Sequence, residues 1–189
     1  MAPPPTTAVP SDFVPLTGHC NCKALTYTLK AMPMIIHCCH CTWCQRESGS
    51  AFALNAQIEC YNLSVNTPPS SPSKQIQPNI THTPSPSGAG QIFASCPSCN
   101  VVLYTHYGGN MSRAYVKVGT LDDASRQRVR PDVHLFTTTK LDWVDLSREV
   151  ENGVKCFEGF YEEESDAWSE SGLERLAALR AWAAQEKGL

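Results

Sequence analysis

Apolar and polar residues alternate along several short segments of the chain, and this pattern predicts a mainly β protein. The alternation has the two-residue period of strands that bury one face. β-branched and aromatic residues, which favour strands, are frequent in the last four of the segments named below. We expect strands at residues 25–29, 52–58, 61–65, 91–94, 101–106, 114–118 and 132–138.

The pattern changes near the C-terminus, where residues 165–187 are rich in alanine, leucine, glutamate and arginine. Apolar residues recur there near helical spacing, at Trp168, Leu173, Leu176, Leu179 and Ala183. We expect one C-terminal helix that covers a face of the sheet. Gly172 weakens this expectation for the first half, because glycine inside a helix costs about 1 kcal/mol.

Two segments show no periodic pattern. Residues 1–15 are rich in Pro, Thr and Ala and predict a flexible tail. Residues 66–90 are dominated by Pro, Ser, Thr, Asn and Gly and predict a long loop or insertion. The remainder predicts one domain at 16–164, which the insertion interrupts. The helical segment 165–189 should pack on this domain. A chain of 189 residues is long enough for one hydrophobic core.

Composition excludes some classes of function. No apolar run is long enough to span a bilayer, and the start, MAPPPTTAVP, lacks the basic and apolar stretches of a secretory signal. We therefore expect a cytoplasmic protein with no membrane partner. The net charge of −3 and the pI near 6.0 provide no basic field for a nucleic acid backbone.

The ten cysteines are the main chemical feature of the sequence. In a reducing compartment, cysteines two or three residues apart are more typical of metal ligands than of disulfides. Cys96 and Cys99 of CPSC supply two thiolates, and Cys20 and Cys22 supply two more. Together they suit a closed, tetrahedral structural zinc site. Asn100 follows the second cysteine of CPSC, a position that commonly has positive φ, which asparagine tolerates.

A second cluster, Cys39, Cys41 and Cys44 in CHCTWC, supplies three close thiolates and no obvious fourth ligand. Three protein ligands and an open position are typical of catalytic zinc. In an extended backbone, the neighbours Cys38 and His40 would point away from Cys39. The alternative is a second closed structural site, completed by Cys38, His40, Cys60 or Cys156.

The charge of the three-thiolate site predicts its chemistry. Three thiolates around a divalent zinc leave a net charge of about −1, whereas three neutral histidines leave about +2. The less positive metal acidifies water poorly and is better suited to holding a substrate thiol as a nucleophilic thiolate. We therefore expect a reaction that makes or breaks a carbon–sulfur bond.

The segments GHCNCKALTY, CHCTWCQRESGSAF and FASCPSCNVVLY, followed by VKVGTLDD, RPDVHLF and Trp143, resemble the glutathione-dependent formaldehyde-activating enzyme family, which has the Mss4-like zinc-binding β fold. The resemblance covers residues 16–144. It implies two zinc ions per chain, a structural one on Cys20, Cys22, Cys96 and Cys99 and a catalytic one on Cys39, Cys41 and Cys44. It also implies a carbon–sulfur lyase that condenses formaldehyde with glutathione to S-hydroxymethylglutathione.

Two positions depart from the family pattern. Gln45 stands where an arginine often follows the last zinc cysteine, which puts an anion contact near the site in doubt. Asn100 replaces the usual knuckle glycine.

Three residues near the three-cysteine motif, and His134 far along the chain, are candidates for binding substrate or moving a proton. Arg46 could bind a substrate carboxylate, or form a surface salt bridge. Trp43 could form a wall of the substrate site, or shield the metal from water. His40 could shuttle a proton, or support a ligand from behind. His134 could reach the site from another strand, or be a buried histidine with its hydrogen bonds satisfied.

The leading hypothesis is a zinc-dependent lyase acting on a small thiol, by default glutathione. The alternative is a non-catalytic, Mss4-like, zinc-stabilised protein-binding module. Nucleic acid binding, suggested by distant relatives such as centromere protein V, is disfavoured by the acidic balance. The apolar stripe of the C-terminal helix is compatible with closing the domain or with a homodimer.

Overall fold

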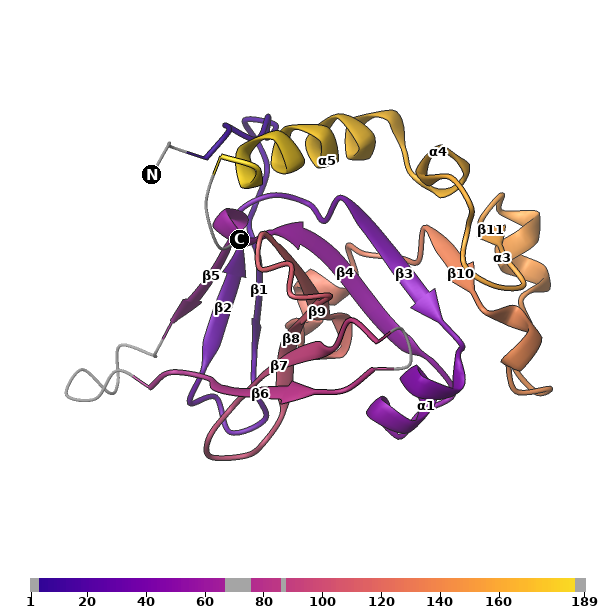
Figure 1. Ribbon diagram of the computed structural model, residues 1–189, viewed down its shortest axis with the longest axis horizontal. Helices are drawn as coiled ribbons and strands as arrows, with labels where there is room; N and C mark the ends of the chain where they lie inside the picture. The colour runs from indigo at the N-terminus through magenta and orange to yellow at the C-terminus, as the bar shows by residue number, and fades with distance from the viewer. Residues whose placement is uncertain (1–3, 67–75, 86–87, 186–189) are drawn as a thin grey trace.

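The computed structural model describes residues 4–66, 76–85 and 88–185 and contains two β-sheets with a long helix lying across one end (Figure 1). In the smaller sheet, β2 lies between two antiparallel neighbours. Its strands are β1 (Leu16–His19), β2 (Thr26–Leu29) and β5 (Leu63–Asn66).

The larger sheet has eight strands and carries most of the residues that matter for function. Neighbouring strands are antiparallel, except that β10 runs parallel to both β3 and β11. The order across the sheet is β11 (Lys155–Cys156), β10 (Val133–Leu135), β3 (Ile35–Cys39), β4 (Ala53–Glu59), β9 (Arg113–Lys117), β8 (Val102–Tyr107), β7 (Gln91–Ser95) and β6 (Asn79–Thr83).

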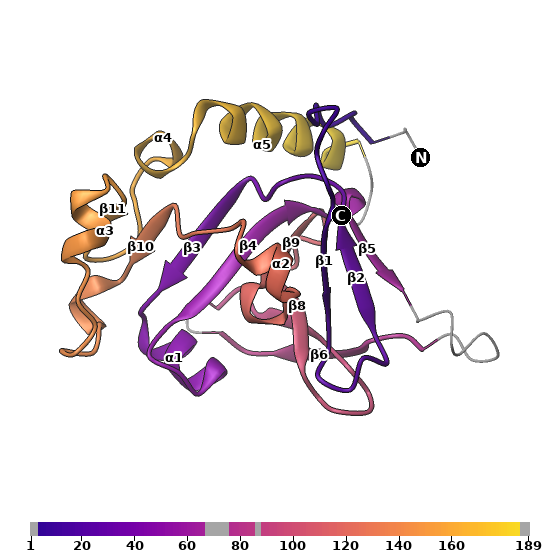
Figure 2. The ribbon, with the colours of Figure 1, turned by 180° about the vertical axis from the view of Figure 1, so that it is seen from behind.

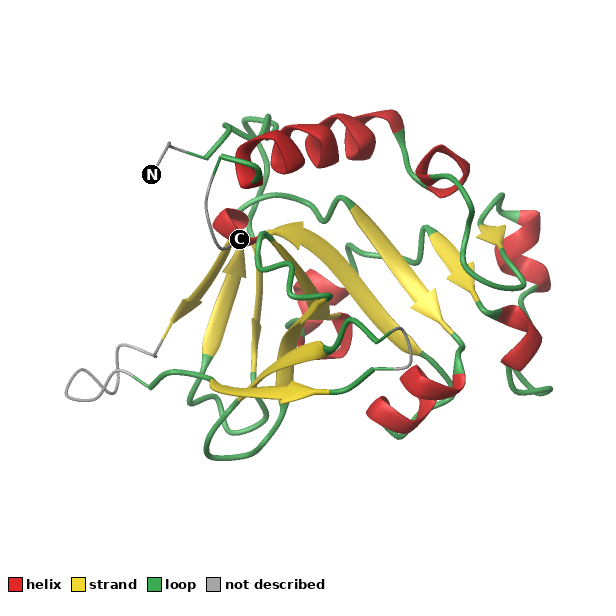
Figure 3. Cartoon of the chain, viewed as in Figure 1, coloured by secondary structure: helices red, strands yellow, loops and turns green. Residues whose placement is uncertain are grey.

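Helices lie mainly at the ends and edges of the sheets, as Figure 3 shows. No helix in the described part of the chain has both the length and the apolar character needed to cross a bilayer. The α-helices are α1 (Thr42–Ser48), α2 (Asp123–Arg126), α3 (Ser147–Glu151), α4 (Glu164–Ala167) and α5 (Glu170–Ala183). Three 3₁₀ turns are η1 (Cys60–Asn62), η2 (Val118–Thr120) and η3 (Thr137–Thr139).

The hydrophobic core consists of two clusters. The first joins the small sheet to the large one and includes Leu16, Tyr27 and Val116. The second packs α5 against β3 and β10, with Leu176 and Val133 among its members. Seen from behind, α5 runs along the edge of the molecule above β3 and β4 (Figure 2). Burial of apolar area in these clusters is the main term that stabilises the fold.

Most strand predictions are confirmed. Residues 25–29, 52–58, 61–65, 91–94, 101–106 and 114–118 overlap β2, β4, β5, β7, β8 and β9. The segment 132–138 contains β10 but turns into η3 at Thr137. The alternation gave no signal for β3, because all five of its residues are buried and a strand covered on both faces does not alternate.

Two expectations require correction. The segment 66–90 was expected to be a long loop, but residues 79–83 form β6, antiparallel to β7; four of its five residues are exposed, which removes the alternating pattern. Residues 67–75 and 86–87 of that segment lie outside the described residues. The single helix expected over 165–187 is instead the pair α4 and α5, separated at Trp168 and Ser169. Residues 186–189 are also outside the described part.

Gly172 has a packing role rather than a weakening one. It lies in the first turn of α5, where the Ser169 side chain accepts a hydrogen bond from its backbone N–H. A Cβ atom on residue 172 would lie 2.8 Å from the carbonyl oxygen of Met34. Glycine therefore lets the helix approach the chain just before β3.

The N-terminal segment makes some contact with the core. Described residues 4–15 form neither helix nor strand. Phe13 is nevertheless half-buried against the first core cluster, and the Arg128 guanidinium lies 5.4 Å from its ring centroid. The expected tail therefore has at least one anchored aromatic residue.

Candidate metal centres and cavity

The four cysteines from the two paired motifs meet as the spacing predicts. The thiol sulfurs of Cys20, Cys22, Cys96 and Cys99 all lie within 4.8 Å of one another. The Sγ atoms of Cys20 and Cys22 are 3.5 Å apart, and those of Cys22 and Cys96 are 3.7 Å apart. A tetrahedral zinc with Zn–S bonds of about 2.3 Å requires S···S separations of about 3.8 Å, so this set fits a metal ion.

The two loops that carry these thiols share a local conformation. The residue after the second cysteine of each pair, Lys23 or Asn100, has a φ of 59°. The positive φ expected at Asn100 is confirmed. The backbone N–H of Leu25 points at the Cys20 sulfur, at 3.3 Å. Burial raises the pKa of the Cys20 thiol to about 12, so a bound cation is needed to keep it deprotonated near neutral pH.

The second cluster forms where β3 passes into α1. Cys39 ends the strand, Cys41 caps the helix and Cys44 lies in its first turn, and their sulfurs are all within 4.8 Å of one another. The backbone N–H of Cys44 donates to the Cys41 sulfur at 3.4 Å. Hydrogen bonds with Cys39 and Cys44 lower the pKa of the Cys41 thiol, and hydrogen bonds with Cys39 and Cys41 raise the pKa of the Cys44 thiol. This donor set is also suited to a soft, thiophilic metal ion.

No fourth ligand joins this cluster from the described part of the chain. Among the described residues, no further cysteine, histidine or acidic side chain has a ligand atom within 4.8 Å of all three sulfurs. Cys38 and His40, proposed above as completing ligands, form a separate group with His134. Cys60 is half-buried beside other apolar residues and Cys156 is exposed.

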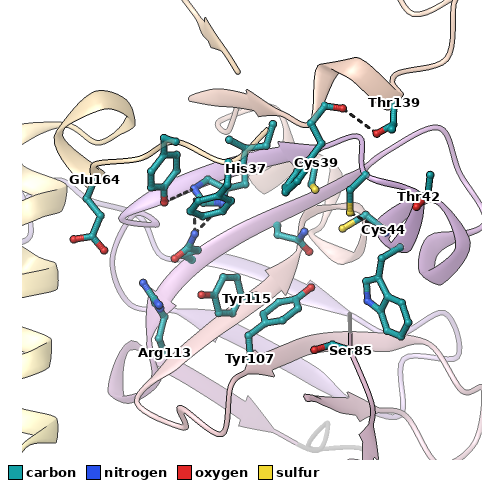
Figure 4. A pocket seen from close by; sticks show the side chains of 18 residues that line it. His37, Cys39, Thr42, Cys44, Ser85, Tyr107, Arg113, Tyr115, Thr139 and Glu164 are labelled. Atoms are coloured by element: carbon teal, nitrogen blue, oxygen red, sulfur yellow. Dashed lines mark hydrogen bonds between the residues drawn. The ribbon is translucent and has the colours of Figure 1, made fainter. Parts of the chain in front are cut away.

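The three sulfurs face a cavity of about 620 Å³ (Figure 4). All three cysteines contribute to its wall. Much of the remaining wall is aromatic, which gives the cavity an apolar character over most of its length. The aromatic lining residues are Trp43, Tyr107, Tyr115, Phe136, Phe160 and Tyr161.

Phe136 has a strained backbone in this wall. Its φ of 57° and ψ of 47° place it in the left-handed region, which is unfavourable for a large side chain. Its N–H donates to the carbonyl of Gly159 at 2.9 Å. Phe136 lines the cavity in this conformation, and the sequence gave no signal of it.

A polar group lies in the cavity away from the thiols. The Gln57 side-chain amide is 3.0 Å from His37 Nδ1, and the Tyr161 hydroxyl is 3.4 Å from His37 Nε2. Trp168 Nε1 donates to the same hydroxyl at 2.9 Å. Burial, together with the positive charge of Arg113, lowers the pKa of His37 to about 3. His37 is therefore neutral at physiological pH.

The residues proposed to bind substrate have different positions. Trp43 lines the cavity, and its Nε1 donates to Gln91 Oε1 at 2.9 Å, which fixes the indole ring. Arg46 is exposed on α1 and is not among the described residues that line the cavity. His40 is fully buried and is likewise absent from that lining. The structure gives no support to substrate contact by Arg46 or His40.

Gln45 has a structural contact in place of the anion contact that an arginine would offer. Its side-chain Nε2 donates to the carbonyl oxygens of His40, at 2.7 Å, and Thr139, at 2.8 Å. It thereby ties the start of α1 to η3.

His40 and His134 form a buried pair behind the thiol cluster. His40 Nε2 lies 3.0 Å from His134 Nδ1, and Cys38 Sγ lies 3.6 Å from the same His40 nitrogen. The ring centroids are 5.3 Å apart. Two imidazole rings whose nitrogens are 3.0 Å apart reach this separation only when the two nitrogens point at each other. The three ligand atoms are close enough to hold a metal, but this geometry fits an N–H···N hydrogen bond better. His134 Nε2 is 4.0 Å from Glu149, too long for a hydrogen bond.

The fold and the clusters define a mainly β protein with a C-terminal helix and cysteine groups able to hold metal ions. The model of the glutathione-dependent formaldehyde-activating enzyme family matches residues 15–139. The chain belongs to this family, as its sequence motifs indicated. No curated protein matches the chain. A Rhodobacter sphaeroides protein of known crystal structure, a structural genomics target, shares 16% identity over 75% of this chain and 98% of its own, with a TM-score of 0.37.

Proposed function

We propose that the protein is a zinc-dependent carbon–sulfur lyase of the formaldehyde-activating type. It would join a thiol, by default glutathione, to an electrophilic carbon such as an aldehyde, or reverse that step. One observation carries the proposal: Cys39, Cys41 and Cys44 converge on the wall of a cavity, and the described residues add no fourth ligand. Membership of the family supports the same reaction class.

Two zinc ions per chain are part of this proposal, and the two donor sets support it. Four thiols at tetrahedral spacing suit a structural zinc, and three thiols beside a cavity suit a catalytic one. When bound in the three-thiol site, zinc would hold a substrate sulfur as a nucleophilic thiolate. The four-thiol set lies between the β1–β2 and β7–β8 loops and would stabilise the fold.

The protein's own residues shape the site around that sulfur. Trp43 is a wall beside the thiols, held by its hydrogen bond to Gln91. The aromatic part of the lining offers few hydrogen-bonding groups to water, which favours attack by sulfur over hydration of an aldehyde. Because His37 is neutral, it adds no charge to the cavity wall. A cytoplasmic location is part of the proposal, since reducing conditions there keep these thiols free.

The test compares Cys41→Ser with the wild type and with Cys156→Ser, an exposed cysteine outside all three groups. The rate of glutathione–formaldehyde adduct formation is measured above the spontaneous rate, with circular dichroism as a check of folding. We expect Cys41→Ser to fold and to lose the catalysed rate, and Cys156→Ser to keep it. Equal catalysis by Cys41→Ser would remove the three-thiol site from the mechanism. Loss of the fold, with no thiol binding in the wild type, would favour the protein-binding module.

A further inference from the structure

We propose that Arg113 binds a carboxylate of the substrate, so that the cavity selects a ligand with a carboxylate at one end, an apolar body and a sulfur at the other. This inference deepens the proposed function and rests on it for the position of the sulfur. It identifies a specificity-determining residue that neither the motifs nor the family match assigns.

The guanidinium of Arg113 has no anionic partner within the described chain. Arg113 is the first residue of β9 and lines the cavity, and its Nε is buried without a hydrogen-bond partner. Its guanidinium carbon lies over the Tyr115 ring, 5.4 Å from the ring centroid. A buried donor without a partner costs about 1–3 kcal/mol, and more when it is charged. An anionic ligand would remove this cost.

Two other basic residues at the large sheet show the contrast. Lys117, at the other end of β9, lies 2.5 Å from Glu47. Arg175 of α5 forms two hydrogen bonds with the buried carboxylate of Glu59. Arg113, alone of these three, faces the cavity instead of a carboxylate.

The one acidic residue in the described lining does not neutralise Arg113. Glu164 lines the cavity, but its Oε1 and Oε2 each accept a hydrogen bond from Arg180. Its charge is therefore matched outside the cavity. Near Arg113 lie the neutral groups of His37 and Gln57, which add no negative charge to that part of the wall.

The arrangement of the lining then gives the class of ligand. Figure 4 shows Arg113 on one side of the cavity and the sulfur atoms of Cys39 and Cys44 on the other. The aromatic rings of Tyr107 and Tyr115 lie in the wall between them, with ring centroids 4.7 Å apart. A ligand that satisfies both ends and this wall is a thiol adduct with an aryl or alkyl group and a carboxylate. A carboxyl group of glutathione can fill the Arg113 end, and a carbon partner larger than formaldehyde can fill the apolar part.

The first test measures the carboxylate site without sulfur. Isothermal titration calorimetry of the metal-loaded protein compares 4-phenylbutyrate with its amide, which has the same shape and no charge. Variants are Arg113→Met, Arg113→Lys and, as a control, Arg148→Met, an exposed arginine of α3 outside the lining. Thermal unfolding of each variant confirms that it folds.

We expect the wild type and Arg148→Met to bind the acid at least tenfold more tightly than the amide, on the order of one charge-assisted hydrogen bond. Arg113→Met should lose this preference. Arg113→Lys should keep part of the preference for the acid, because lysine keeps the positive charge but lacks the planar guanidinium that can bind both carboxylate oxygens. Equal binding of acid and amide by the wild type, binding of neither, or an unchanged preference in Arg113→Met would overturn the inference.

A second readout separates this inference from the proposed function. Cobalt-loaded protein is titrated with 4-(mercaptomethyl)benzoate while the visible spectrum is recorded. A spectrum that ignores the thiol, together with an intact acid preference, would overturn the thiol-binding metal and leave Arg113 as an anion site. A spectrum that responds equally to the acid and its amide, in wild type and Arg113→Met, would overturn the role of Arg113 and leave the thiol chemistry.

Discussion

Cys38 and Cys39 are consecutive in β3, yet their side chains belong to opposite faces of the strand. Cys39 lines the cavity with Cys41 and Cys44, whereas Cys38 is 1% exposed and lies beside His40. This follows from the alternation of side chains along an extended backbone. One strand therefore presents a candidate metal ligand on one side and a buried Cys–His group on the other.

This pair gives a matched test of the ligand set. Cys39→Ser should reduce the metal content by one ion per chain and abolish adduct formation above the spontaneous rate, because two thiolates do not hold zinc tightly. Cys38→Ser should keep both. Elemental analysis of purified protein, together with the activity assay, checks the two variants. Loss of metal from Cys38→Ser alone would mean that the wrong face of β3 has been assigned.

The four-thiol cluster should behave as a structural site. Cys96 is fully buried, and Cys96→Ser removes one of four ligands whose metal binding is coupled to folding. We expect the free energy of unfolding to fall by about 3 kcal/mol or more, with loss of a metal ion. Urea denaturation of this variant beside Cys156→Ser supplies the measurement. Equal stability of the two variants would show that the cluster does not support the fold.

The attachment of α5 to the sheet depends on a buried ion pair. Arg175 Nε donates to Glu59 Oε1 at 2.8 Å, and its Nη2 donates to Oε2 at 2.6 Å, while Glu59 is fully buried. Arg175→Met leaves that carboxylate unpaired and should cost about 3 kcal/mol in urea denaturation. Arg180→Met breaks the more exposed pair with Glu164 and should cost less than about 1 kcal/mol. Similar losses of unfolding free energy in the two variants would show that the burial of Glu59 does not make its ion pair more important than the exposed one.

His106 should make the protein sensitive to mild acid. Burial lowers its pKa, and its Nδ1 lies 2.7 Å from the carbonyl oxygen of Arg113. In the unfolded chain, this histidine takes up a proton near pH 6.5. In the folded protein, protonation of His106 requires a lower pH. The stability from this group is therefore complete above about pH 6.5 and is lost as the pH falls through that value toward the lower folded pKa.

Replacement of His106 should flatten this pH dependence. In His106→Asn, the urea midpoint should decline less between about pH 7 and pH 5.5 than in the wild type. His82→Asn, at an exposed position on β6, is the control and should follow the wild type. An identical pH dependence in all three proteins would exclude His106 as a contributor.

The cysteine clusters could be predicted because their ligands come in closely spaced motifs and the chemistry of such motifs is narrow. C-x-C and C-x2-C spacings limit where the sulfurs can lie, and the asparagine at position 100 indicated a positive φ there. The larger sheet was only partly predictable. β3 is buried on both faces and β6 is mostly exposed, so neither alternates.

The cavity depends on contacts that no local pattern encodes. Arg113 stands in an ordinary strand sequence, RAYVK, and its importance comes from a buried Nε that has no hydrogen-bond partner in the described structure. Phe160 and Tyr161 reach the cavity from a segment between β11 and α4 that showed no motif. Arg46 was the natural candidate from its place beside the cysteines, but it is exposed on α1.

The central claim is that the three-thiol site is open to a substrate sulfur. The most direct test is a glutathione titration of the cobalt-substituted protein, with the metal content per chain and the visible spectrum recorded together. We predict two metal ions, one with bands that change as thiol is added and one with unchanging four-sulfur bands. Two four-sulfur spectra that ignore glutathione would contradict it and identify both clusters as structural.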